Sequence, residues 1–80
     1  MDALTAAAEA ADTTHPEDGL RAVAALRRLT DALELAQVEA SLRSGMGWSE
    51  IASHLGVSRQ AVHKKHAKRV QPGLAPNRRR

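Results

Sequence analysis

The 80-residue sequence contains no cysteine, no phenylalanine and no tyrosine, and Trp48 is its single tryptophan. The absence of cysteine excludes disulfide bonds and thiolate metal sites. No apolar run approaches the roughly 20 residues that cross a bilayer, and no basic and apolar leader follows Met1. We therefore expect a cytoplasmic protein with no membrane partner.

A chain this short, with so few large side chains, has a small core. Below about 70 to 80 residues, a single core rarely supplies more than about 3 to 5 kcal/mol, and disulfides, a metal or a partner subunit usually add stability. Since disulfides are excluded, a partner subunit is the expected source of additional stability.

Charge is unevenly distributed along the chain. Residues 1–18 carry five acidic and no basic residues, residues 19–57 carry four of each, and residues 58–80 carry eight basic and no acidic residues. A strongly basic end is typical of a segment that binds a polyanion such as nucleic acid. A merely solvated basic surface is the alternative interpretation.

Residues 48–70, WSEIASHLGVSRQAVHKKHAKRV, indicate two short helices separated by a turn. Ile51 and Leu55 share one face of the first helix, and Gly56 permits the left-handed backbone that ends it. We expect Val57 to fill the corner and Ser58 to cap the second helix. This arrangement is a helix-turn-helix, whose second helix enters the major groove of DNA.

Apolar residues recur at helical spacing from Pro16 to Ser44, which indicates one long helix with Gly45 as its stop. The predicted fold is all-α: a long N-terminal helix followed by a helix-turn-helix, with a three-helix DNA-binding head. The predicted organisation is a flexible or frayed acidic segment at 1–14, the long helix at 15–44, the helix-turn-helix at 45–70 and a flexible basic tail at 71–80.

The long helix carries two apolar stripes. The second of these belongs to the predicted core of the head, which comprises Leu35, Val38, Leu42, Met46, Trp48, Ile51, Leu55, Val57 and Val62. The first stripe has heptad-like spacing, and leaving its leucines in water forgoes about 1.5 to 3 kcal/mol each. We therefore expect a homodimer that pairs through Leu20, Val23, Leu26, Leu29 and Leu33. In the alternative interpretation, residues 1–13 fold back as a short helix and cover them.

The faces of the second short helix follow from its periodicity. With Val62 inward, Gln60 and Lys64 point away from the core and should face DNA. Gln bonds an adenine edge in two places, and Arg does the same for guanine. The predicted base-reading residues are Ser58, Arg59, Gln60 and His63. The predicted phosphate contacts are Ser49, Lys64, Lys65, Lys68 and Arg69, with Ser49 expected to cap the first short helix.

The sequence gives little indication of base stacking by Trp48, metal binding or catalysis. Trp48 is expected to anchor the core rather than to stack on bases, and His66 to lie at the core's rim as a neutral imidazole. His63 and His66 are three residues apart, but no cysteine or acidic partner on that helix completes a metal site. No Gly-rich phosphate loop or nucleophile motif is present. We expect no metal, no cofactor, no small-molecule ligand and no enzymatic activity.

The segment WSEIASHLGVSRQAVHKKH resembles the helix-turn-helix of the promoter-reading C-terminal domain of bacterial sigma factors. It is more closely similar to small actinobacterial helix-turn-helix proteins. The residues that match structural positions are Ile51, Ala52, Leu55, Gly56, Val57 and Val62, and those that match DNA-facing positions are Ser58, Arg59, Gln60, His63 and Lys64. At His66, relatives usually have a large apolar residue.

The resemblance implies a three-helix head and a role in transcription. Because the other domains of a sigma factor are missing, it does not imply recruitment of the polymerase core. The predicted function is a sequence-specific transcriptional regulator at the nucleoid, a homodimer that reads the major groove with a helix from Arg59 to Arg69. Two alternatives remain: a nucleoid-associated architectural protein with weak sequence preference, and a helical protein-interaction adaptor.

Overall fold

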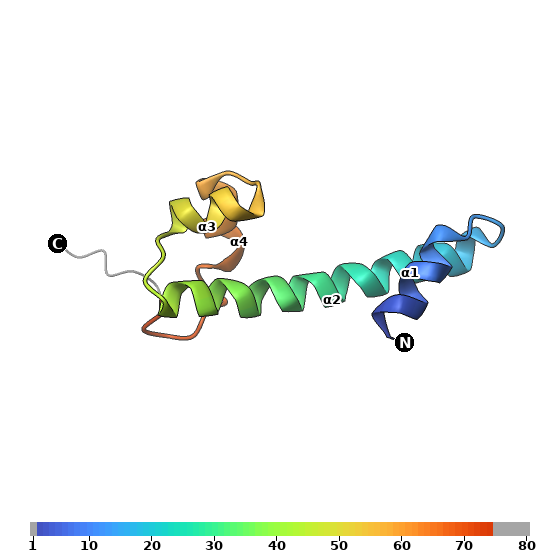
Figure 1. Cartoon of the computed structure of the whole chain (residues 1–80), viewed down its shortest axis with the longest axis horizontal. Coiled ribbons are helices and arrows are strands. Elements are labelled where there is room, and N and C mark those ends of the chain that lie inside the picture. The colour runs from blue at the N-terminus through green and yellow to red at the C-terminus, as the bar shows by residue number, and fades with distance from the viewer. Residues whose placement is uncertain (1, 75–80) are drawn as a thin grey trace. The chain divides into compact units, whose positions relative to one another are not determined.

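The structure, a computed structural model, describes residues 2–74, and these form helices without any strand (Figure 1). The helices are α1 (Ala3–Ala11), α2 (Pro16–Arg43), α3 (Trp48–Leu55) and α4 (Arg59–His66). The chain divides into two compact units, unit 1 (Met1–Leu33) and unit 2 (Glu34–Arg80), and α2 contributes to both. The all-α prediction is confirmed. None of the helices within residues 2–74 combines the length and the apolar character that a membrane-spanning segment requires.

The ends of α2 lie where local chemistry places them. Pro16 occupies the first helical position, where its missing N–H costs nothing, and the amide of Gly19 donates to the carbonyl oxygen of His15 at 2.9 Å. Gly45, at a φ of 98°, follows the last turn and redirects the chain. The long helix predicted at 15–44 is therefore confirmed to within one residue at each end.

In unit 1, α1 forms where the sequence analysis predicted a frayed or flexible segment. The carboxylate of Asp2 caps this helix by accepting a hydrogen bond from the amide of Thr5 at 2.8 Å. Ala6 is buried in α1, and Gly19 and Ala22 are buried in α2. Alanine favours helix, and small side chains at these positions allow the two helices to approach closely.

The fold-back alternative therefore describes unit 1 in part. Ala22 is fully buried and Leu26 is half-buried, as a covering helix requires. The other leucines in this part of α2 are exposed to solvent: Leu20 is 70% exposed, Leu29 41% and Leu33 57%.

The core of unit 2 joins the C-terminal part of α2 to α3, α4 and the segment that follows α4. Its buried members are Val38, Leu42, Trp48, Ile51, Ala52, Val62 and Val70, and its partly buried members include Leu35, Met46, Ala67 and Leu74. This confirms most of the predicted core. The prediction was wrong for Leu55 and Val57, which are 40% and 47% exposed.

The link between α3 and α4 follows the predicted turn chemistry. Gly56 adopts the left-handed conformation at a φ of 73°, and the amide of Val57 donates to the carbonyl oxygen of Ala52 at 3.1 Å. The hydroxyl of Ser58 caps α4 by accepting from the amide of Ala61 at 3.0 Å. At the start of α3, however, the N-cap is Gly47 and not Ser49, which lies inside the first turn.

The chain after α4 also differs from the prediction. The helix ends at His66 and not at Arg69, because the amides of Arg69 and Val70 both donate to the carbonyl oxygen of His66, at 2.9 and 3.1 Å. This tight turn brings Val70 into the core. The amide of Gln71 then donates to the Glu39 carboxylate at 3.0 Å, so residues 71–74 are held against α2. The rest of the predicted tail, with its arginines, lies outside the described residues.

Substitution by alanine should change the stability in opposite directions at Gly19, which is buried in α2, and at Gly56, which forms the turn before α4. A Cβ at Gly19 would lie 3.5 Å from the carbonyl oxygen of Asp12, which is ordinary contact, so Gly19→Ala should raise the free energy of unfolding by about 0.5 to 1 kcal/mol. Gly56→Ala, at positive φ, should lower it by about 1 to 2 kcal/mol. Urea denaturation followed by circular dichroism measures both, and a destabilised Gly19→Ala variant would contradict the close but unstrained packing of α1.

Candidate nucleic-acid interface

Helix α4 is amphipathic, with one side held in the core and the other open. Val62 and His66, four residues apart, are buried, whereas Gln60 and Lys64 are exposed. Residues four apart share a face, and positions two residues from each lie on the opposite side. The predicted orientation of this helix is therefore confirmed, while its contact with DNA stays a prediction.

The first turn of α4 presents three exposed polar residues in succession, Ser58, Arg59 and Gln60. The Ser58 hydroxyl accepts the amide of Ala61 and still has its own proton to donate. The N-terminal end of a helix carries partial positive charge, which favours an approaching anion. This turn therefore combines a guanidinium, a carboxamide and a hydroxyl at a site that attracts negative charge.

His63 has a structural task besides any contact with DNA. Its ring packs edge-on against the indole of Trp48, with the ring centroids 5.1 Å apart and the planes at 81°. His63 is half-buried and Trp48 is buried, so this contact helps to hold α3 against α4. The core-anchor role predicted for Trp48 is confirmed. The base-reading role of His63 stays a prediction.

Lys65 is exposed like Lys64, but it points toward α2. Its Nζ is 3.2 Å from Oε2 of Glu34 on α2, so its charge is already directed toward a carboxylate. About 100° separates successive helical residues, which places Lys65 only about 60° from the inward direction of Val62. The assignment of Lys65 as a phosphate contact stays a prediction, and this lysine already has a carboxylate partner within the fold. The other predicted phosphate contacts are exposed: Ser49 in α3, Lys64 in α4, and Lys68 and Arg69 in the turn after α4.

A short polar contact in unit 2 joins His66 to Glu34. Nε2 of the fully buried imidazole lies 2.5 Å from Oε2 of the carboxylate, and within residues 2–74 Nδ1 has no hydrogen-bond partner. Because a carboxylate oxygen accepts, Nε2 of His66 is the donor in this contact. His66 lies inside the core, whereas the sequence analysis expected it at the core's rim.

The sequence analysis missed Glu34 as the partner of His66. Glu34 precedes Val38 by four residues and so shares the face of α2 that enters the core. An acidic residue on an apolar face was the available signal, because a buried carboxylate requires a donor.

The contact with His66 sets the ionisation of Glu34. Donation from the His66 imidazole lowers the pKa of the Glu34 carboxyl below its ordinary value. Partial burial opposes this shift, and the nearby Lys65 ammonium reinforces it. Because the folded state holds the charged form more tightly than the unfolded chain does, the contact stabilises the fold above the ordinary pKa of glutamate.

The start of α3 is a second feature that can face an anion. In the part of the chain that is described, no side chain caps this helix at Gly47. The early amides of a helix lack intrahelical partners, and a phosphate can accept them. Ser49 adds an exposed hydroxyl in the same turn.

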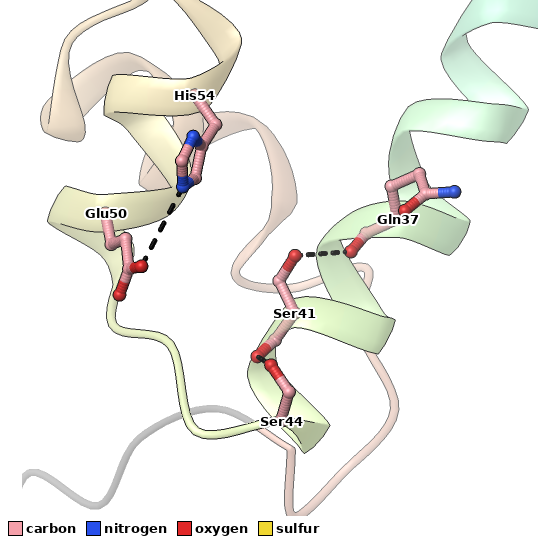
Figure 2. Close-up of polar contacts among 5 residues, drawn as sticks. All are labelled: Gln37, Ser41, Ser44, Glu50 and His54. Carbon is pink, nitrogen blue, oxygen red and sulfur yellow. Dashed lines mark hydrogen bonds and ion pairs between the residues drawn. The ribbon is translucent and has the colours of Figure 1, made fainter.

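A shallow groove lies between the C-terminal part of α2 and α3. It is lined by Gln37, Val38, Ser41, Met46, Ile51, His54 and Leu55. Figure 2 shows that the polar groups here bond within their own helices: Ser41 Oγ donates to the carbonyl oxygen of Gln37 at 2.8 Å, and His54 Nε2 lies 3.8 Å from Oε2 of Glu50. The lining contains no lysine or arginine, so the groove is not suited to a polyanion.

Charge separates the two units. Residues 2–33 carry six acidic and three basic residues, whereas residues 34–74 carry three acidic and six basic ones.

Among residues 2–74, no group of three or more histidines, aspartates and glutamates could hold a metal ion. Comparison of the chain with protein-family models, curated proteins and solved structures finds no match.

The Glu34–His66 contact predicts a specific acid sensitivity. Hydrogen bonds to charged groups contribute about 1.5 to 3 kcal/mol, so Glu34→Gln should lower the free energy of unfolding by about that amount at neutral pH. The wild-type chain should lose the same stabilisation as pH falls below about 4.5, the ordinary pKa of glutamate, and through the lowered pKa of Glu34. Urea denaturation over a pH series measures the difference between the two chains.

The matched control is Glu50→Gln, which removes an exposed carboxylate of the same unit. It should leave the acid dependence close to that of the wild type. A difference between wild type and Glu34→Gln that stays constant from neutral to acidic pH would show that the ionised Glu34 does not stabilise the fold.

Proposed function

We propose that this protein is a sequence-specific DNA-binding regulator of transcription that reads the major groove with α4. The supporting observation is that Gln60 and Lys64 are exposed while Val62 and His66 of the same helix are buried. In this proposal α3, the turn at Gly56 and α4 are a helix-turn-helix, and the C-terminal part of α2 completes the three-helix head.

The first turn of α4 is the proposed base-reading element. Arg59 would bond the O6 and N7 atoms of a guanine, and Gln60 the N6 and N7 atoms of an adenine. Ser58 would donate its hydroxyl proton beside them, and His63, which follows on the same helix and packs edge-on against Trp48, is the fourth proposed base-reading residue. These residues enter the groove first because the N-terminal part of a recognition helix inserts most deeply.

Phosphate contacts then set the position of the helix on the duplex. Lys64, Lys68 and Arg69 are the proposed cationic contacts, and the uncapped start of α3 with Ser49 provides amide and hydroxyl donors. Such contacts carry affinity and register but no sequence information. Lys65 is a weaker candidate for this set, because its ammonium already pairs with Glu34.

An architectural protein with weak sequence preference would use the same surface, and binding measurements separate the two. A preferred site is first selected from randomised duplexes, and affinities for that site and for a random duplex are then measured by fluorescence anisotropy. Arg59→Ala should weaken the selected complex by about 1 to 3 kcal/mol, or roughly 5- to 150-fold, with little effect on random DNA. Lys68→Ala should weaken both and lower the salt slope by about 1.

Arg28→Ala is the matched control, since it removes an exposed arginine from α2 within unit 1. It should leave both affinities nearly unchanged. Equal losses on selected and random DNA for Arg59→Ala would favour the architectural protein. A purified chain that binds no duplex at low ionic strength would contradict DNA binding and favour the adaptor.

A further inference from the structure

Unit 1 carries an apolar surface that its own helices leave uncovered. We call this surface the open face, and its members are Leu4, Ala7, Ala8 and Ala11 of α1 and Leu29 and Leu33 of α2. All six are exposed, and Leu4 is 85% exposed. Positions 4, 7, 8 and 11 form one stripe of a helix, and this stripe contains no polar residue, although the solvent side of a surface helix is ordinarily polar.

The leucines of the open face lie beyond the reach of α1. Gly19 lies against the backbone of Glu9 and Asp12, so the C-terminal end of α1 contacts the first turn of α2. The nine residues of α1 span only about 13 Å, so this helix can cover at most about nine residues of α2. Leu29 and Leu33 continue the apolar stripe that begins at the buried Ala22, but they lie further along α2 than the part that α1 can cover.

We propose that the open face binds a second copy of this chain, with Leu29 and Leu33 of each copy packed on the alanine stripe of the partner's α1. The open face is complementary to itself, because α2 contributes large leucine side chains and α1 contributes small alanine side chains. The stripes from Leu4 to Ala11 and from Leu26 to Leu33 are equally long, about 10 Å each. A two-fold axis forms both contacts at once, as in an isologous dimer.

The size and charge of the open face fit this occupant. Leu4, Leu29 and Leu33 are 85%, 41% and 57% exposed, and with the three alanines the six residues expose on the order of 500 Å². A two-fold pair that covers them completely would remove on the order of 1,000 Å² from water, the lower limit for a specific interface. The positions of α2 that border the stripe are Ala25, Thr30 and Ala32, which bring no like charges together. Helical periodicity places Arg27, Arg28 and Asp31 on the other side of α2.

This interface differs from the seam expected from the sequence. Leu20 and Val23 line a separate shallow groove beside Thr13 and Pro16, and Leu26 is half-buried. The dimer therefore uses Leu29 and Leu33 from the predicted set and adds α1. This proposed dimer is independent of the proposed DNA binding, because the DNA-contacting residues belong to unit 2. Its test also needs no DNA.

Association of the full chain is measured by sedimentation equilibrium. The wild-type chain should be dimeric in the micromolar range, and Ala8→Glu should raise the dimer dissociation constant more than tenfold because it buries a carboxylate. The matched control is Thr5→Glu, which adds the same charge to α1 on the flank that carries Glu9. Both variants replace exposed residues, so circular dichroism should show unchanged helix content.

The absence of cysteine permits a second test of the pairing. Chains carrying Ala8→Cys and chains carrying Leu33→Cys are mixed in equal amounts and oxidised mildly. Disulfides between the two kinds of chain should exceed those expected from random pairing. A wild-type chain that stays monomeric, an Ala8→Glu variant that dimerises normally, or disulfides only between identical chains would each overturn the proposal.

Discussion

The hydrogen bond between Glu34 and His66 is the constraint on which the placement of α4 depends. Trp48 is the one large aromatic residue among the hydrophobic members of the unit 2 core, and the other hydrophobic members are aliphatic side chains of modest size. The imidazole fills a position that would otherwise require a large apolar side chain, and its Nε2 reaches α2 at the same time. Together with Val62 it determines which face of α4 enters the core, and the exposure of Gln60 and Lys64 follows from helical periodicity.

The same contact divides the basic residues of α4 by role. Glu34 draws Lys65 toward α2, at 3.2 Å, whereas Lys64 beside it stays in solvent. One lysine therefore reinforces the fold, and its neighbour remains available to an external anion. Arg59 and Lys68 lie outside this network, the first at the start of the helix and the second in the turn beyond its end. The surface that we propose for DNA is smaller than the count of basic residues suggests.

The two units have complementary chemistry. Unit 1 is acidic and exposes apolar side chains, and unit 2 is basic and encloses most of its own. A polyanion favours the second of these surfaces and an apolar partner favours the first. Association and DNA binding are thus proposed for separate parts of the chain, and a small protein of this kind gains from a partner the burial that its own core lacks.

Local rules in the sequence determined the helices and most of their ends. Pro16, Gly45, Gly56 and Ser58 act through the backbone within a few residues of themselves, so their roles could be predicted. The inward direction of Val62 could also be predicted, because helical spacing alone orients a face. Ser49 was misplaced because serine and glycine both serve as N-caps, and Gly47 lies only two residues earlier.

Tertiary structure decided what no local rule contains. The pairing of Glu34 with His66 joins residues 32 positions apart, and the return of Val70 and Gln71 to α2 ended α4 before Arg69. The alanines of α1 favour helix by themselves, but only close approach to Gly19 and Ala22 gave that helix a place to lie. Periodicity specifies which side of a helix is apolar, whereas the length of the element packed against it decides how much of that side remains exposed.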